Sequence, residues 1–185
     1  MNAQITNLLV SLGAMQIARK IPLEDPDVLN YVRIGYVSVQ LLVISIHFYV
    51  SYVIKKKNDL TVLKYVEPAP LMSQEPPKVV TTTVKDYDMS ETSKALRGVY
   101  TGIAMLAFMH LYMKYTQPLF IQGLMGLKGL FDAKEIMIHV FGKKAEGDLA
   151  RPFKAPPGMF GVEAPGPATD SASIKAAEES AKKTQ

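Results

Sequence analysis

The sequence predicts an all-α membrane protein with about three hydrophobic helices, one of them a clear span, plus a polar cytosolic loop and a disordered C-terminal tail. Apolar residues make up an ordinary 48% of the chain, but their distribution is uneven. They collect in the windows 5–18, 34–54 and 98–131, whereas most charged residues lie in 55–97 and 132–185. A soluble core would interleave charged and apolar residues at helical or strand spacing. The segregation therefore indicates hydrophobic helices joined by polar segments.

The clearest span is the predicted transmembrane helix 28–54. Its stretch 34–54 has no Asp, Glu, Lys or Arg, and a helix of that length reaches roughly 31 Å, which matches a hydrocarbon core of about 30 Å. Tyrosines at both ends resemble interfacial aromatic belts. Lys55, Lys56 and Lys57 follow at once, and the positive-inside rule places that end in the cytosol.

The segment 55–97 is predicted to be a cytosolic loop. Its prolines between positions 68 and 77 exclude a long helix there. Residues 79–84 are compatible with a short strand. Asp88 or Ser90 is placed to cap a helix that continues into the next apolar window.

The window 98–131 allows two interpretations. One is a single span over about residues 98–118. The other is a hairpin of two short helices, 98–113 and 117–131, that turns at Pro118. Each half would reach only about 24 Å, so it would need a thinned bilayer or protein partners. We favour the hairpin because it returns the C-terminus to the cytosol.

The two ends of the chain differ in character. An N-terminal hydrophobic helix is predicted at 1–20, and its apolar stretch either enters the membrane or lies in the interface. No basic residue precedes that stretch and no cleavage site follows it, so we expect it to remain in the mature protein. A polar segment covers 132–156. The tail 157–185 is rich in Gly, Pro, Ala, Ser, Lys and Glu, a composition typical of disorder.

Three polar residues of the main span form a candidate hydrophilic groove. Arg33, Gln40 and His47 are spaced by seven residues, which puts them within about 40° of one another around a helix. Polar groups near the middle of a bilayer face protein or water and not lipid. The alternative is that Gln40 and His47 only hold neighbouring helices together through hydrogen bonds, and that Arg33 extends to the membrane surface.

Two further sets of residues are candidate contact surfaces. Met105, Met109 and Met113 recur every fourth residue, and a flexible methionine face suits varied hydrophobic substrates. Lipid-facing or core packing is the alternative. Lys55–Lys57 is a candidate contact for anionic lipid or for the ribosome, in addition to its role in setting the topology.

Small residues recur in the window 98–131. Gly123, Gly126 and Gly129 are spaced by three, and Gly98 and Gly102 by four. Both spacings allow close approach of helices, although glycines also mark irregular backbone.

Catalysis, metals and cofactors have no support in the sequence. The chain has no cysteine, which excludes disulfides and thiolate chemistry. It contains no Walker A, GxGxxG, GxSxG or HExxH motif. The histidines His47, His110 and His139 are scattered and form no metal-ligand spacing. We therefore expect a protein that is not an enzyme and that needs no metal or other cofactor.

Several segments together resemble one family. They are Glu24-Asp25-Pro26, Tyr31-Val32-Arg33-Ile34, KNDLTVLKYVEP at 57–68, TTTVKDYD at 81–88, YTGIAMLAFMHLYMKYTQPLF at 100–120 and IHVFGKKAEGDLARPFKAP at 138–156. Over about residues 1–156 the chain resembles the fungal endoplasmic-reticulum membrane proteins named for inorganic phosphate transport, also known as a component of the SND, or SRP-independent, targeting pathway. The resemblance implies a multi-pass protein of the endoplasmic-reticulum membrane. It also implies as partners the translocon channel, the ribosome, nascent membrane proteins, other SND components and the lipid bilayer.

Three functions follow as hypotheses. The first is a biogenesis factor that targets and inserts membrane proteins, by analogy with insertases of the Oxa/YidC type, whose polar grooves and short helices need no ATP site. The second is a phosphate carrier or an accessory of phosphate transport, but carriers usually need repeats and a midplane anion site. The third is a scaffold or receptor that docks the ribosome or translocon through the loop 55–97 and the tail.

Overall fold

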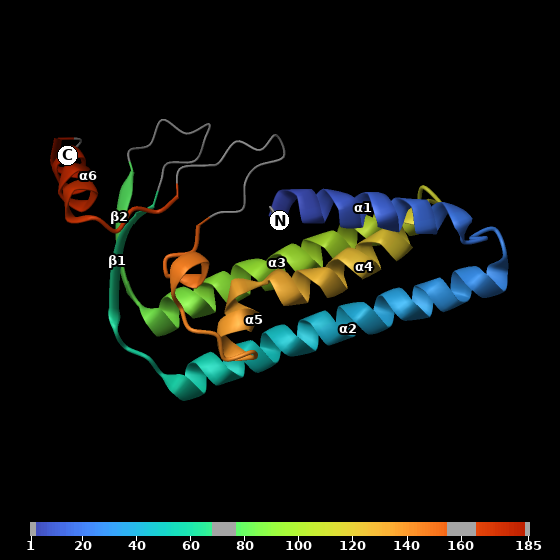
Figure 1. Ribbon diagram of the computed structural model, residues 1–185, viewed down its shortest axis with the longest axis horizontal. Helices are drawn as coiled ribbons and strands as arrows, with labels where there is room; N and C mark the ends of the chain where they lie inside the picture. Colours follow the sequence, from blue (N-terminus) through green and yellow to red (C-terminus); the bar gives the residue numbers. More distant parts are fainter. Residues whose placement is uncertain (1–2, 68–76, 155–165, 184–185) are drawn as a thin grey trace. The chain divides into compact units, whose positions relative to one another are not determined.

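The computed structural model describes residues 3–67, 77–154 and 166–183, and it is mostly helical (Figure 1). In chain order the elements are α1 (Ala3–Lys20), α2 (Pro26–Lys57), β1 (Val62–Glu67), β2 (Lys78–Thr83), α3 (Val84–Leu111), α4 (Gln117–Asp132), α5 (Lys134–His139), the 3-10 helix η1 (Gly147–Leu149) and α6 (Ser171–Lys183). The predicted predominance of helix is confirmed. The all-α prediction is wrong where β1 and β2 form a sheet.

Contacts divide the chain into two compact units. The helical unit comprises Met1–Ser51 and Thr92–Met137, and the sheet unit comprises Tyr52–Glu91 and Ile138–Gln185. Each unit is therefore built from two separate stretches of the sequence.

Helix α2 has a recognisable cap at each end. The Asp25 carboxylate accepts hydrogen bonds from the backbone N–H groups of Asp27, at 2.9 Å, and Val28, at 3.4 Å, and Pro26 occupies the first turn. The helix ends before Asn58, whose φ of 46° is the left-handed conformation that closes many helices. Within the described part of the chain, α2 is the one helix long and apolar enough to cross a membrane, judged by length and composition.

The window 98–131 contains two helices and not one continuous span. Helix α3 ends at Leu111, and Lys114 adopts a positive φ of 61° in the turn that follows. Helix α4 begins at Gln117, with Pro118 in its first turn. A proline there has no amide N–H that the helix would otherwise leave unpaired. The break between the two helices, residues 112–116, precedes Pro118, the residue at which the hairpin interpretation placed the turn.

Small residues let the helices of the helical unit approach one another. Ala14 and Ala18 on α1 are buried, and α1 packs against α4. A Cβ added to Gly123 of α4 would lie 3.7 Å from the Tyr36 ring of α2, which is ordinary contact distance. The glycine spacing noted in the sequence thus brings α4 against α2.

The sheet unit contains an antiparallel pair of strands. Val62 of β1 lies opposite Thr83 of β2, and the register runs on to the pair Glu67 and Lys78. Ala168 bridges to Val66 through hydrogen bonds of 2.8 Å and 3.2 Å, so the C-terminal segment covers part of the outer edge of β1. The β-branched residues of β2 favour this pairing, which explains why part of the predicted loop 55–97 is ordered.

Helix α6 corrects the prediction of a disordered tail over 157–185. It packs against both strands, with Ala177 buried, and an exposed ion pair of 2.7 Å joins Lys64 of β1 to Glu178. Composition alone missed the apolar side of this short amphipathic helix. The remainder of the predicted tail, 157–165 and 184–185, lies outside the described residues.

Helix α3 also begins earlier than predicted. The Thr83 hydroxyl accepts a hydrogen bond of 3.1 Å from the Asp86 N–H and donates one of 2.8 Å to the Asp86 carboxylate. The first of these bonds caps the N-terminus of the helix, and the second joins the two side chains. Asp88 and Ser90 therefore lie inside the helix and do not cap it.

Candidate functional site: a polar pocket in the helical unit

A pocket of about 400 Å³ lies among helices α2, α3 and α4 of the helical unit. Its walls are mostly apolar side chains and glycine backbone, with three polar side chains from two helices. The lining residues are Gln40, Val43 and His47 from α2, Ala95, Gly98, Val99 and Gly102 from α3, Gln122, Met125, Gly126, Gly129 and Leu130 from α4, and Ala133.

His47 is held in one orientation by its own helix. Its side chain is buried, with the residue 4% exposed, and its Nδ1 lies 2.8 Å from the carbonyl oxygen of Val43. A carbonyl only accepts, so Nδ1 carries the proton. In the neutral ring Nε2 is then a hydrogen-bond acceptor in a residue that lines the pocket.

Gln40 and Gln122 bring two neutral amides to the same pocket. Gln40 is 8% exposed. Among the residues that the structure describes, no hydrogen bond is formed by the side-chain amide of Gln40 or of Gln122. Buried polar groups usually have partners, so these amides are available to a hydrogen-bonding group that enters.

Glycines provide the space for these amides. A Cβ added to Gly102 would lie 2.8 Å from Nε2 of Gln122, and one added to Gly126 would lie 3.5 Å from Nε2 of Gln40. At Gly98 and Gly129 an added Cβ would meet nothing within 4 Å. Two of the glycines therefore accommodate the amides, and the other two border open space.

The third predicted groove residue lies elsewhere. Arg33 is exposed, is absent from the pocket lining, and donates from Nε to Nε2 of His110 at 3.0 Å. Nδ1 of His110 in turn donates to the Tyr115 carbonyl at 3.0 Å. The structure thus brings Gln40 and His47 together, whereas Arg33 links α2 to the end of α3.

Helix α2 exposes many large apolar side chains, and it buries two polar ones beside Val43, Val50 and Ile54. Its buried positions include Gln40 and His47, whereas Leu41 is 60% exposed and Phe48 is 56% exposed. The same helix exposes further large apolar residues, namely Tyr31, Ile34, Val37, Leu42, Tyr49 and Tyr52. A hydrocarbon environment favours an apolar outer surface with the polar side chains turned toward other helices.

The other predicted surfaces are only partly formed. Met105 is 62% exposed on α3 and Met109 is half-buried, but Met113 lies beyond the end of the helix in the turn. The methionine stripe is therefore shorter than predicted. Lys55, Lys56 and Lys57 are all exposed at the C-terminal end of α2.

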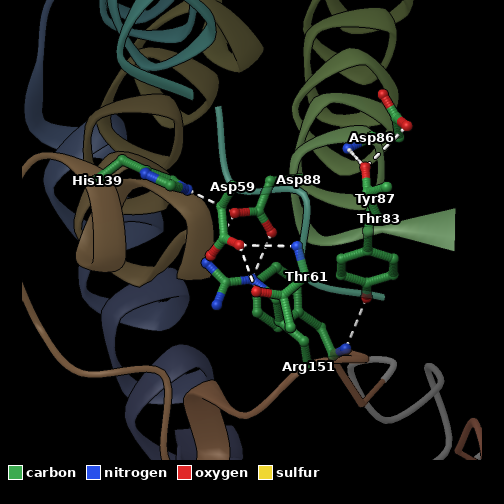
Figure 2. A network of polar contacts seen from close by, with 9 residues as sticks. Asp59, Thr61, Thr83, Asp86, Tyr87, Asp88, His139 and Arg151 are labelled. Atoms are coloured by element: carbon green, nitrogen blue, oxygen red, sulfur yellow. Dashed lines mark hydrogen bonds and ion pairs between the residues drawn. The ribbon is translucent and has the colours of Figure 1, made fainter. Parts of the chain in front are cut away.

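A second polar cluster, in the sheet unit, was not predicted from the sequence (Figure 2). The side chain of Asp88 is 1% exposed. It accepts hydrogen bonds from Arg151 Nε at 2.6 Å, Arg151 Nη2 at 2.7 Å and His139 Nε2 at 2.7 Å. Burial by itself would raise the pKa of Asp88, but the hydrogen bonds and the Arg151 charge outweigh it, and the pKa is lowered.

An aromatic core adjoins this cluster. Tyr87 contacts Tyr65 and Phe153 edge-to-face, with ring centroids 5.7 Å and 5.5 Å apart, and its hydroxyl accepts the Phe153 N–H at 2.6 Å. Burial raises the pKa of Tyr87. Among the described residues no group of three metal-binding side chains occurs. The Asp88 cluster and the aromatic core each join the segments 81–88 and 138–156, two of the segments on which the family resemblance rests.

Comparison with known proteins agrees with the resemblance. Residues 1–185 match the family described as Phosphate transport (Pho88). SRP-independent targeting protein 3 of Saccharomyces cerevisiae is 46% identical over 96% of this chain and 95% of its own length. An uncharacterized protein of Schizosaccharomyces pombe is 45% identical over 87% of this chain and 80% of its own length. The SRP-independent targeting protein 3 homolog of the same yeast is 44% identical over 86% and 83%.

No solved structure matches the chain. The family match covers the whole sequence, and the first of these relatives aligns over nearly the full length of both proteins. On these grounds the chain belongs to the Pho88 family.

Proposed function

We propose that this protein is a non-enzymatic factor of SRP-independent targeting that receives hydrophobic segments of membrane proteins in the endoplasmic-reticulum membrane. Two relatives that align with most of this chain carry the name SRP-independent targeting protein 3. The family resemblance supports the endoplasmic reticulum as the location. The proposed partners are nascent membrane proteins, the translocon, the ribosome and other SND components.

The observation that carries the proposal is the pocket within an apolar surface. A segment that enters a bilayer must move polar groups past hydrocarbon, which is energetically unfavourable. Gln40, His47 and Gln122 line a pocket whose helix α2 is apolar outside, so they can hydrogen-bond such groups at the level of the membrane. This is the insertase form of the hypothesis.

Short helices support the same proposal. Helix α4 has 16 residues, and a helix of that length reaches only about 24 Å, less than a hydrocarbon core of about 30 Å. If α4 lies in the bilayer, it thins the membrane beside the pocket. A multi-pass arrangement of α1, α3 and α4 around α2 is part of the proposal.

Site-specific photocrosslinking during translation into microsomes tests the proposal. A photoreactive residue at Gly129 borders the pocket, and Gly35 on α2 is a matched control, since an added Cβ meets nothing within 4 Å at either position and Gly35 does not line the pocket. A third probe at Val62, 70% exposed on β1, reports on the sheet unit.

Crosslinks from Gly129 to a nascent hydrophobic segment, stronger than those from Gly35, are expected. Crosslinks confined to Val62, or made only to translocon or ribosomal proteins, would contradict the insertase form. They would favour the scaffold hypothesis, for which the folded sheet unit and the exposed Lys55–Lys57 are the supporting observations.

A direct phosphate-carrier function has less support than the insertase or the scaffold hypothesis. The family description names phosphate transport, yet the lining of this pocket contains no Lys or Arg. An anion site in a membrane would need such a charge or helix N-termini. We therefore propose at most an indirect contribution, through the biogenesis of transporters.

A further inference from the structure

The pocket offers hydrogen bonds but almost no charge. Its three polar side chains are two amides and one imidazole, and His47 is the single titratable group among the lining residues. A charged group that entered would find no opposite charge on these walls. Burying an unpaired charge is far more unfavourable than burying an amide or a hydroxyl that is hydrogen-bonded.

The two amides have complementary capacities. Each glutamine side chain presents two N–H donors and one carbonyl acceptor, and His47 Nε2 adds an acceptor. Gln40 is more than nine-tenths buried, lines the pocket, and has no side-chain hydrogen bond to any described residue. A hydroxyl or amide can donate and accept at the same time, so it can satisfy these groups in either orientation.

We propose that the pocket selects hydrophobic segments that carry an uncharged polar side chain, such as Ser, Thr, Asn or Gln, and that Gln40 and Gln122 determine this specificity. This inference rests on the proposed function, because it names the substrate class of the same pocket. Segments with a Lys or Asp at the corresponding position are disfavoured, and purely apolar segments are bound without the additional hydrogen bonds.

The pocket is large enough for such a group. Its volume of about 400 Å³ falls within the range of roughly 300–1,000 Å³ of ligand pockets in proteins. Gly98 and Gly129 line the same pocket, and a Cβ added at either position would meet nothing within 4 Å.

The test uses the full-length protein with the photoreactive residue at Gly129. Four nascent segments are compared, identical apart from one central guest residue: Leu, Gln, Lys or Asp. The Gln guest is expected to crosslink about threefold more than the Leu guest, in line with hydrogen bonds between helices in membranes, and the Lys and Asp guests less than Leu. The double variant Gln40→Leu/Gln122→Leu should remove the preference for Gln, so that the Gln guest crosslinks no more than the Leu guest in the same variant. Gln16→Leu, the same change on an exposed position of α1, should have no effect.

A charge variant keeps the test decisive if the double variant does not fold. Gln122→Glu preserves the shape of the side chain and adds one negative charge, so it should raise the Lys-guest crosslink above the Leu-guest crosslink. Equal crosslinking of all four guests, or Lys above Gln in the unmodified protein, would overturn the specificity and leave the proposed function intact. Loss of all crosslinks from Gly129 would overturn the proposed function itself.

Discussion

The guanidinium of Arg151 binds both carboxylate oxygens of Asp88, through hydrogen bonds of 2.6 Å and 2.7 Å. Asp88 lies near the start of α3, and Arg151 belongs to the irregular segment that follows η1. His139 at the end of α5 donates to the same carboxylate. One buried side chain thereby connects three separate segments of the sheet unit (Figure 2).

Removing the arginine should destabilise the sheet unit strongly. Arg151→Met removes the cationic partner of the buried Asp88 carboxylate, and loss of one member of a buried pair lowers the free energy of unfolding by about 3–5 kcal/mol. We expect the lower part of that range because His139 remains. Chemical unfolding of the purified protein in detergent, followed by tyrosine fluorescence, measures the effect.

Lys64→Met is the matched control for that measurement. It breaks the ion pair with Glu178, whose two side chains are 43% and 45% exposed. An exposed pair of this kind contributes about 0–1 kcal/mol. Similar losses for the two variants would show that the Asp88 cluster has no special role.

Acid should weaken the same cluster. The pKa of Asp88 is lowered from the ordinary value of 3.8, so the unfolded chain takes up this proton at a higher pH than the folded protein. The stability that Asp88 contributes is therefore present above that ordinary value and is lost as the pH falls below it. The difference in unfolding free energy between wild type and Asp88→Asn should shrink between about pH 6 and about pH 3. A constant difference over this range would refute the assignment.

Single-cysteine labelling should distinguish lipid exposure from water exposure on α2. The chain has no cysteine of its own, so no background has to be removed. Leu41 is 60% exposed, yet Leu41→Cys should resist a water-soluble maleimide in intact microsomes because lipid covers it. Lys56→Cys should react at once, and Tyr31→Cys only after the membrane is permeabilised. Rapid reaction of Leu41→Cys would contradict a membrane span.

Two glycines of the pocket should respond differently to alanine. Gly129→Ala should raise the thermal unfolding midpoint, since alanine is favoured over glycine in helices by about 1 kcal/mol and its Cβ meets no neighbour. Gly102→Ala should give a smaller gain, because its Cβ would lie 2.8 Å from Nε2 of Gln122, the end of a flexible side chain that must move aside. A larger gain for Gly102→Ala than for Gly129→Ala would contradict this contact.

Parts of the helical unit could be predicted because their signals are local in the sequence. The apolar run of α2, the Asp25–Pro26 start and the proline at the start of α4 can each be recognised within a few residues. Helical spacing alone also placed Gln40 and His47 on the same side of α2, where both line the pocket. Gln122 was missed because its place in the pocket depends on how α4 packs against α2 and α3.

The sheet unit could not be predicted in the same way. Its contacts join residues that lie far apart in the sequence, such as Asp88 with Arg151 and Val66 with Ala168. His139 looked like an isolated histidine because its partner lies on another helix. Composition indicated disorder for the tail, but a few contacts with β1 and β2 are enough to order α6.

The discontinuity of the sheet unit has a consequence for synthesis on the ribosome. Strands β1 and β2 emerge early, but Ile138, Phe153 and Ala168, which complete their core and cover the edge of β1, emerge only after all of the segment 92–137 has been made. Until then the hairpin is a two-stranded sheet, which is marginally stable by itself. The sheet unit therefore completes its folding late, although its strand β1 is translated early. It can close only after the segment 92–137, which separates its two halves, has left the ribosome.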